Sequence, residues 1–291
     1  MLLEINGISK QYNKAAWALQ DINLQLKPGI IGLLGPNGAG KSSLMRILAT
    51  ITKPTTGTVF WNGMNIGKKP DELRRVLGYL PQDFGVYPHL KPIEFLEYAA
   101  SLKGVSSRQT RTRMLELLEL LNLQDTLKRP IGSFSGGMRQ RIGIAQALLN
   151  DPKVLIVDEP TVGLDPEERL RFRSILTDLS GERIIIFSTH IVSDIEATAD
   201  QIAIMSKGRL LVKSDPMVLL RSVQGKVWSV VISEHELQDA RAKWLISGTI
   251  RREDGLQLRI VSVHQPTSQA MEVSPNLEDA YLYVRHNGGE Q

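Results

Sequence analysis

A glycine-rich segment between an apolar run and a helical pattern constrains the fold of this chain more than any other feature. Residues 35–42, Gly-Pro-Asn-Gly-Ala-Gly-Lys-Ser, match the pattern GxxxxGK[ST]. The run at 30–34 before it is typical of a short buried strand, and residues 42–51 have apolar side chains at helical spacing. The sequence therefore predicts a strand, a loop and a helix in succession, which is a unit of α/β proteins.

The composition of this loop suits the binding of phosphate groups. Glycines let the backbone turn with its N–H groups pointing inward, and with the start of the helix they would cradle the β- and γ-phosphates of a nucleotide. The positively charged side chain of Lys41 would contact those phosphates, and the hydroxyl of Ser42 would bind Mg²⁺. The predicted nucleotide-binding residues of the loop are Gly35, Pro36, Asn37, Gly38, Ala39, Gly40, Lys41, Ser42 and Ser43. The loop alone leaves kinases, GTPases and motor ATPases open, because all of them share it.

Two adjacent carboxylates follow a second buried-strand pattern. Val154–Val157 is fully apolar, and Asp158 and Glu159 come directly after it, at the end where a parallel sheet presents its ligands. Asp158 is placed to hold Mg²⁺ through its water shell, and Glu159 to orient and deprotonate an attacking water. Two adjacent acids could also be a solvated strand end, but the apolar run before them favours a buried strand.

Apolar runs and helical patterns alternate along much of the chain. Runs at Val154–Val157 and 184–187 flank a helical pattern at 166–179, so a parallel sheet crossed by helices is expected. Alternating residues at 2–7 and Trp17–Leu26 indicate antiparallel strands ahead of it. The predicted fold class is α/β, with a phosphate-loop core and an antiparallel β subdomain.

Two changes of pattern indicate further subdivision. Helical periodicity at 92–102 and 108–121 predicts a helical subdomain at about residues 86–150. We expect one domain over residues 1–218 and a small α+β domain over residues 219–291. In the latter, strands are predicted at Val227–Ile232 and 256–263 and helices at 234–244 and 277–284. A passive attachment and a regulatory or dimer-stabilising role both stay open for it.

Charge and composition narrow the function classes. The net charge of +4 is far from the basic stripe of a protein held on nucleic acid, so no nucleic-acid partner is expected. The absence of cysteine excludes disulfides and thiolate chemistry. The apolar runs are too short to cross a bilayer, and the start lacks a signal-peptide pattern, so the protein is expected to stay where it is made. No metal-ligand spacing links the histidines outside the motifs, which are His89, His235, His264 and His286.

A third motif points to one family of phosphate-loop proteins. Ser135, Gly136 and Gly137, followed by Met-Arg-Gln-Arg and lying shortly before the acidic pair, resemble the signature motif of ABC ATPases. Other phosphate-loop classes lack this motif. Further matches, in the order in which the family has them, are Gln82 for the Q-loop, residues 163–165 for the D-loop and His190 for the switch histidine. The resemblance covers roughly residues 2–215 and implies the ABC ATPase fold.

The resemblance implies a role for each matched residue. In a head-to-tail dimer, Ser135 and the amides of Gly136 and Gly137 would meet the γ-phosphate bound on the other subunit. Gln82 would reach Mg²⁺ or the attacking water and lie beside the coupling helix of a membrane partner, while His190 would contact the γ-phosphate. The implied catalytic residues are thus Glu159, His190 and Gln82, and the metal-binding residues are Ser42, Gln82 and Asp158.

Two further residues take their roles from the same resemblance. Asp165 would connect the two sites of the dimer. Tyr12 matches the aromatic residue that stacks on adenine, although packing beside Trp17 is an alternative.

The family resemblance also implies a function, cofactors, partners and a location for the chain. The chain would be the ATP-binding and ATP-hydrolysing subunit of an ABC transporter, with ATP and Mg²⁺ as cofactors. Its partners would be a separately encoded membrane permease and a second copy of itself or a homologous ATPase subunit. Its location would be peripheral, on the cytoplasmic face of the cell membrane.

Details of the sequence resemble the ABC-2 exporter branch. Met138 stands where the commonest signature has Gln and is familiar from exporter-like branches, and the helix at 92–104 and the segment at 277–284 are also similar to that branch. Phe134, where the signature often has Leu, is a second departure from the commonest pattern. Export is therefore the expected direction. A soluble ABC ATPase that acts on DNA or ribosomes is the main alternative, but the sequence shows neither heptads nor repeats. A small-molecule kinase is a weaker alternative, because a kinase does not need a signature motif that faces a partner subunit.

Overall fold

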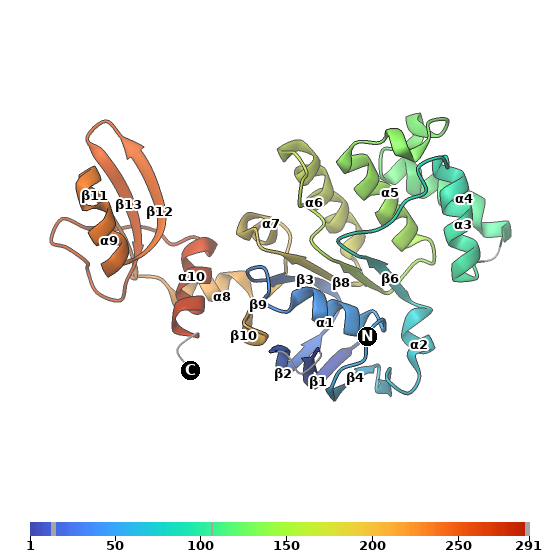
Figure 1. Cartoon of the computed structure of the whole chain (residues 1–291), viewed down its shortest axis with the longest axis horizontal. Coiled ribbons are helices and arrows are strands. Elements are labelled where there is room, and N and C mark those ends of the chain that lie inside the picture. Colours follow the sequence, from blue (N-terminus) through green and yellow to red (C-terminus); the bar gives the residue numbers. More distant parts are fainter. Residues whose placement is uncertain (13–15, 106, 289–291) are drawn as a thin grey trace. The chain divides into compact units, whose positions relative to one another are not determined.

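The computed structural model describes residues 1–12, 16–105 and 107–288 and divides into two compact units (Figure 1). The first unit ends at Leu210 and the second begins at Leu211. The sequence-based boundary, after residue 218, lies within helix α8 (Pro216–Ser222), which belongs to the second unit. Packing thus divides the chain earlier than the change in sequence pattern does.

The first unit opens with an antiparallel sheet in the strand order β2-β1-β4-β5. Strand β1 (Leu3–Gln11) pairs with β2 (Trp17–Leu26) and with β4 (Thr56–Trp61), and β4 pairs with β5 (Met64–Asn65). The alternating apolar residues of β1 and β2 are buried, because successive side chains of a strand point to opposite faces. The predicted antiparallel opening is confirmed.

A parallel sheet forms the centre of the first unit. Its strands are β3 (Gly29–Leu34), β6 (Leu77–Leu80), β7 (Val154–Val157), β8 (Ile184–Thr189) and β9 (Gln201–Ser206). They are neighbours in the order β9-β3-β8-β7-β6. Strands β7 and β8 are buried along their whole length, as in a sheet that is covered on both faces. The predicted α/β class is confirmed.

Helices of the first unit pack on these two sheets. Helix α1 (Lys41–Leu48) buries one side in a hydrophobic core that also contains residues of both sheets. Helices α6 (Pro166–Ser180) and α7 (Val192–Glu196) lie against β3 and β8, and the short α2 (Pro70–Arg74) leads into β6. Strand β10 (Arg209–Ser214) contains the boundary between the units.

Between β6 and β7 the chain forms the predicted helical insert. Its helices are α3 (Pro92–Lys103), α4 (Ser107–Leu120) and α5 (Gly136–Leu148), with the 3-10 turns η1 (Gln124–Thr126) and η2 (Ile131–Ser133) ahead of α5. The three α-helices contact one another. The apolar side chains that give residues 108–121 their helical periodicity are buried, namely Met114, Leu117, Leu118 and Leu121.

The second unit is built on an antiparallel sheet in the order β12-β13-β11-β14. After α8, its elements are β11 (Val227–Ile232), η3 (Glu234–Glu236), α9 (Leu237–Lys243), β12 (Leu245–Arg252), β13 (Gly255–Val261), β14 (Met271–Glu272) and α10 (Leu277–Asn287). A separate hydrophobic core includes Val230, Leu258 and Ile260. The sequence prediction omitted β12, in which Ser247 and Gly248 interrupt the apolar pattern and the pairing register shifts.

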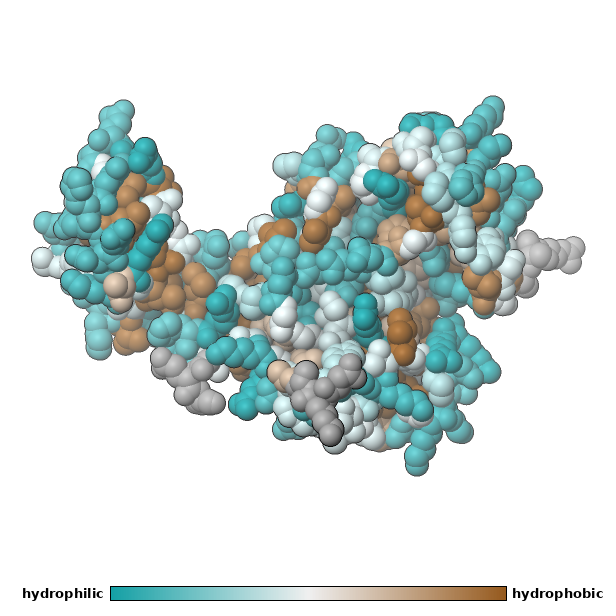
Figure 2. Space-filling view, in the orientation of Figure 1, coloured by the Kyte–Doolittle hydropathy of each residue, from teal (hydrophilic) through white to brown (hydrophobic). Residues whose placement is uncertain are grey.

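The surface in Figure 2 is mostly hydrophilic, with small hydrophobic areas. Exposed large apolar side chains of the helical insert include Tyr98 and Leu102 on α3. Among the described helices, none has both the length and the apolar character needed to span a membrane.

Candidate active site

The phosphate-loop pattern forms the connection between β3 and α1, as predicted. Gly40, at the N-terminus of α1, has φ of 101°. A Cβ atom at this position would lie 2.5 Å from the carbonyl oxygen of Ala18, so only glycine fits the backbone here. At Gly38 a Cβ atom would meet nothing within 4 Å. The loop is therefore packed tightly at Gly40 and open at Gly38.

A hollow of about 540 Å³ lies at the open side of this loop. Its lining brings together five separate parts of the sequence, namely Tyr12, Ala18, the phosphate loop, Gln82 and Glu159. The lining residues are Tyr12, Ala18, Asn37, Gly38, Ala39, Gly40, Lys41, Ser42, Ser43, Gln82 and Glu159. Most of the predicted nucleotide-binding residues thus share one site.

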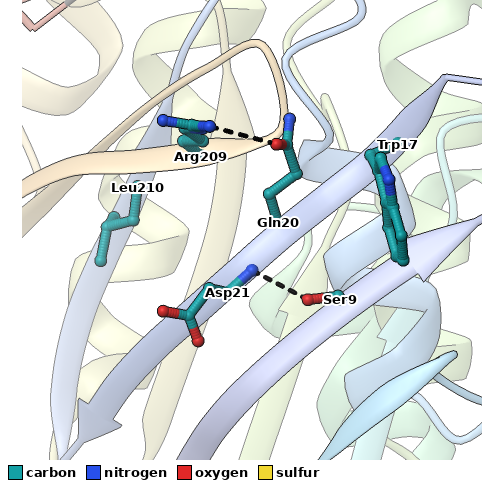
Figure 3. Close-up of a pocket in the computed structure, with 6 residues that line it drawn as sticks. All are labelled: Ser9, Trp17, Gln20, Asp21, Arg209 and Leu210. Carbon is teal, nitrogen blue, oxygen red and sulfur yellow. Dashed lines mark hydrogen bonds between the residues drawn. The ribbon is translucent and has the colours of Figure 1, made fainter. Parts of the chain in front are cut away.

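A second hollow, of about 500 Å³, lies on the antiparallel sheet of the first unit (Figure 3). Its cationic residue, Arg209, donates to Oε1 of Gln20 at 3.3 Å, and the backbone N–H of Asp21 donates to Oγ of Ser9 at 2.9 Å. The lining contains no glycine-rich loop. Because the two volumes are similar, the loop and its lysine, rather than size, identify the candidate site.

Lys41 and Glu159 form a buried ion pair beside the loop. Nζ of Lys41 lies 3.2 Å from Oε1 of Glu159 and donates to the carbonyl oxygen of Gly35 at 2.8 Å and of Pro36 at 3.2 Å. Oε2 of Glu159 lies 3.1 Å from Nδ1 of His190. The structure therefore brings three of the predicted residues into direct contact, with Glu159 between the lysine and the histidine.

Asp158 is buried and fixed by a serine that the sequence analysis did not single out. Oγ of Ser188 donates to Oδ1 of Asp158 at 2.6 Å and accepts the backbone N–H of Glu159 at 2.8 Å. Burial and the negative charge of Asp158 raise the pKa of the Tyr79 phenol. A polar residue directly after the apolar run at 184–187 was the available signal for Ser188, but only the pairing of β7 with β8 shows its partner.

The signature residues and Asp165 lie at the N-termini of two helices. Oγ of Ser135 accepts the N–H of Met138 at the start of α5, and Oδ1 of Asp165 accepts the N–H of Glu168 at the start of α6. None of the predicted signature residues lines the 540 Å³ hollow. Within one described chain, they are therefore separate from the phosphate loop's own site.

Comparison with known proteins identifies the family. The model of the family described as ABC transporter matches residues 19–162. A Bacillus subtilis (strain 168) protein named "Uncharacterized ABC transporter ATP-binding protein YxlF" is 37% identical in an alignment that covers 98% of this chain and 100% of that protein. The chain belongs to the ABC transporter ATP-binding proteins. This ABC ATPase therefore has the fold and the family that its motifs predicted.

Two further similarities bear on this ABC ATPase. An Escherichia coli (strain K12) protein named "Probable multidrug ABC transporter ATP-binding protein YbhF" is 36% identical over 99% of this chain but only 53% of its own length. This chain thus spans about half of that relative. A solved dimeric ATP-binding cassette in a post-hydrolysis state, bound to ADP and Pi, has a TM-score of 0.66 and 25% identity, covering 73% of this chain and 98% of the cassette.

The donor groups of this ABC ATPase fit Mg²⁺ bound together with a nucleotide. Ser42 and Gln82 line the hollow, and the carboxylate of Asp158 precedes Glu159 in the chain, so the available donors are hydroxyl, amide and carboxylate oxygens. Mg²⁺ prefers such oxygens and usually keeps ligands from water and phosphate. In the described part of the chain no three His, Cys, Asp or Glu residues form a metal-binding group. The residues present thus suit a metal that also has phosphate ligands.

Proposed function

We propose that this chain is the ATP-hydrolysing subunit of an exporter, and that ATP binding and hydrolysis close and open a dimer of such subunits against a separate membrane permease. The carrying observation is the contact of Glu159 with both Lys41 and His190 beside the phosphate loop. A phosphate-binding cation, a buried carboxylate and a histidine are groups suited to phosphoanhydride hydrolysis.

Each of these side chains has a proposed role in the reaction. Lys41 holds the β- and γ-phosphates, and Glu159 accepts a proton from the water that attacks the γ-phosphorus while the bond to the bridging oxygen of ADP breaks. His190 donates to a γ-phosphate oxygen, and Gln82 orients the water. Mg²⁺, held through Ser42, Gln82 and Asp158, would offset the charge of the phosphates.

The ion pair of Lys41 with Glu159 gives the proposed site a defined starting state. The ammonium group lies 3.2 Å from the carboxylate, and the side chain of Lys41 is only 4% exposed. A bound γ-phosphate competes for the same ammonium group, because both partners are anionic. We infer that binding of ATP moves Lys41 from the carboxylate to the phosphate and leaves Glu159 free to accept a proton.

A second subunit would complete the site. Ser135, Gly136 and Gly137 present the N-terminus of α5, a helix of 13 residues, where anions are stabilised. They do not line the hollow of their own chain, and we propose that they meet the γ-phosphate on the partner, with Asp165 connecting the two sites. The dimeric state of the similar solved cassette supports this arrangement.

The helical insert offers a surface for a permease. The rings of Tyr87 and Tyr98 pack edge to face at 5.3 Å, and both side chains are more than 40% exposed. Tyrosine is among the residue types enriched where a few side chains supply most of the binding energy of a protein interface. We propose that this pair, in the segment that follows Gln82, contacts a permease on the cytoplasmic face of the membrane. The multidrug name of one relative supports export.

Affinity purification from detergent-solubilised cells tests the proposal. The tagged chain is expected to retain an integral membrane protein, and Tyr98→Ser should weaken that retention, because it removes the anchor ring. Leu170→Ser is the control, since Leu170 is 60% exposed on α6 outside the insert. Repeated recovery of ribosomes or DNA-bound proteins without a membrane protein would contradict the proposed partner.

A further inference from the structure

A buried carboxylate outside the predicted site contacts three segments that lead to it. Asp194, in α7, is 1% exposed. Its Oδ2 accepts a hydrogen bond from the hydroxyl of Thr161 at 2.6 Å and another from the hydroxyl of Thr189 at 3.4 Å. Its Oδ1 accepts hydrogen bonds from Nε of Arg173 at 3.2 Å and from Nη2 of the same side chain at 2.5 Å. Both oxygens of the buried charge are therefore occupied by donors, as a stable buried carboxylate requires.

Two of the donors lie close in the chain to proposed functional residues, and the third lies on the helix that Asp165 begins. Thr161 is two residues after Glu159, and Thr189 directly precedes His190. The hydroxyl of Thr189 also accepts the backbone N–H of Ile191 at 3.0 Å, so Asp194 supports the backbone on both sides of the histidine. Arg173 lies on α6, the helix that Asp165 caps. One carboxylate thus connects the segments of Glu159, His190 and Asp165.

The backbone at Glu159 needs such support. Its φ is 46°, in the left-handed region that side chains other than glycine rarely adopt. Such a conformation persists where neighbouring contacts hold the chain on both sides. Ser188 accepts the N–H of Glu159 on one side, and the Thr161–Asp194 hydrogen bond holds the chain two residues later.

We propose that Asp194 is a positioning residue for ATP hydrolysis: through Thr161 and Thr189 it holds the carboxylate of Glu159 and the ring of His190 in contact. This inference rests on the proposed function of Glu159 as the base. None of Asp194, Thr161, Thr189 and Arg173 lines the hollow at the phosphate loop. Loss of this support should therefore lower the turnover number and leave ATP affinity unchanged, whereas general unfolding would lower both.

Substitution of Thr161 isolates the contact, because valine has nearly the shape of threonine without its hydroxyl. In the purified full chain, Thr161→Val should lower kcat about tenfold, which corresponds to about 1.4 kcal/mol in the activation free energy, with KM and Kd for Mg-ATP unchanged. Thr161→Ser keeps the hydroxyl and should retain wild-type turnover. Thr177→Val makes the same change at an exposed position on α6 and is the control.

A second variant keeps the inference testable if Thr161→Val fails to fold. Arg173→Lys keeps the positive charge but loses the paired donors, and it should also lower kcat without a change in ATP affinity. Wild-type turnover in folded Thr161→Val, or in Arg173→Lys where Thr161→Val fails to fold, would overturn the inference, and so would an equal loss of ATP affinity.

Glu159→Gln, measured beside these variants, separates the two proposals. If Glu159→Gln hydrolyses ATP slowly while Thr161→Val hydrolyses it at the wild-type rate, only the proposed role of Asp194 is wrong. If Glu159→Gln hydrolyses ATP at the wild-type rate, the assignment of Glu159 as the base is wrong, and the inference about Asp194 fails with it.

Discussion

At the scale of single residues, Lys41 is the group on which both ATP binding and hydrolysis depend in the proposed reaction. Its ammonium group has three oxygen neighbours, from Gly35, Pro36 and Glu159, and the phosphate loop surrounds it. In a partly desolvated site an ionic contact with phosphate is stronger than in water. We therefore expect the lysine to contribute to ATP affinity directly, through the phosphates, and indirectly, by neutralising the carboxylate of Glu159 beside them.

Replacement of Lys41 by alanine tests this dual role. We expect Lys41→Ala to weaken ATP binding by about 10- to 100-fold, in line with the loss of a charge-assisted hydrogen bond, and to abolish hydrolysis. Isothermal titration with Mg-ATP and a phosphate-release assay measure the two effects. Lys68→Ala, which removes an exposed lysine far from the loop in sequence, should change neither. Normal ATP affinity in Lys41→Ala would show that the loop has another purpose.

Single residues were predictable where a short motif fixes both identity and local structure. The phosphate loop, Asp158 and Glu159 follow buried strands directly, so their place at the sheet end followed from the chain itself. The contacts of Ser188 with Asp158 and of Asp194 with Thr161 were not predictable, because the two partners of each contact lie about 30 residues apart in the chain. Tyr12 lines the hollow as stacking on adenine would require, while its role stays a prediction.

At the scale of elements, one buried arginine joins three helices of the first unit. Arg141 on α5 donates from Nη1 to the carbonyl oxygens of Leu121 and Asn122, just after α4. Its Nη2 pairs with Oε1 of Glu168 on α6 at 3.3 Å. The arginine therefore fixes the signature helix against the helix that Asp165 begins.

Loss of this arginine should destabilise the chain without removing any proposed nucleotide contact. Arg141→Ala leaves the carboxylate of Glu168 without its buried partner, so we expect a loss of about 3 kcal/mol in the free energy of unfolding. Urea unfolding followed by circular dichroism measures it. Arg171→Ala also removes an arginine that pairs with Glu168, but this pair is more exposed, so the loss should stay below about 0.5 kcal/mol. Equal effects of the two variants would contradict the account.

Elements with a continuous or regular apolar pattern were predictable in both units, whereas elements without one were missed. The apolar runs of β7 and β8 are continuous, and the helical insert has a regular apolar face, so periodicity identified them. In the second unit, β12 is mostly exposed or partly buried and has a register shift near Gly248, which left no alternating pattern. Its edges therefore follow from pairing with β13 rather than from the local sequence.

At the scale of the whole molecule, every residue proposed to act on ATP lies in the first unit, before Leu211. The second unit has its own core and a fully buried Asp279, which pairs with Arg259 at 2.7 Å. The second unit therefore has a hydrophobic core and a buried ion pair of its own. The proposed hydrolysis therefore depends on the first unit and on a partner copy of it.

The most direct test of the account is the oligomeric state and turnover of Glu159→Gln in the presence of ATP and Mg²⁺. Glutamine keeps the shape of the side chain but removes the proton acceptor, so phosphate release should fall by about 10²- to 10⁴-fold. It also removes the carboxylate that competes with the γ-phosphate for Lys41, so ATP should bind at least as tightly. Glu167→Gln, at an exposed glutamate on α6, is the matched control and should hydrolyse ATP normally.

Light scattering beside a phosphate-release assay gives the decisive comparison. We predict that Glu159→Gln forms a dimer with ATP and remains dimeric, because the nucleotide that closes the two subunits is no longer hydrolysed. Near-normal phosphate release by Glu159→Gln, with no ATP-dependent dimer, would contradict the assignment of Glu159 as the base and the two-subunit site together.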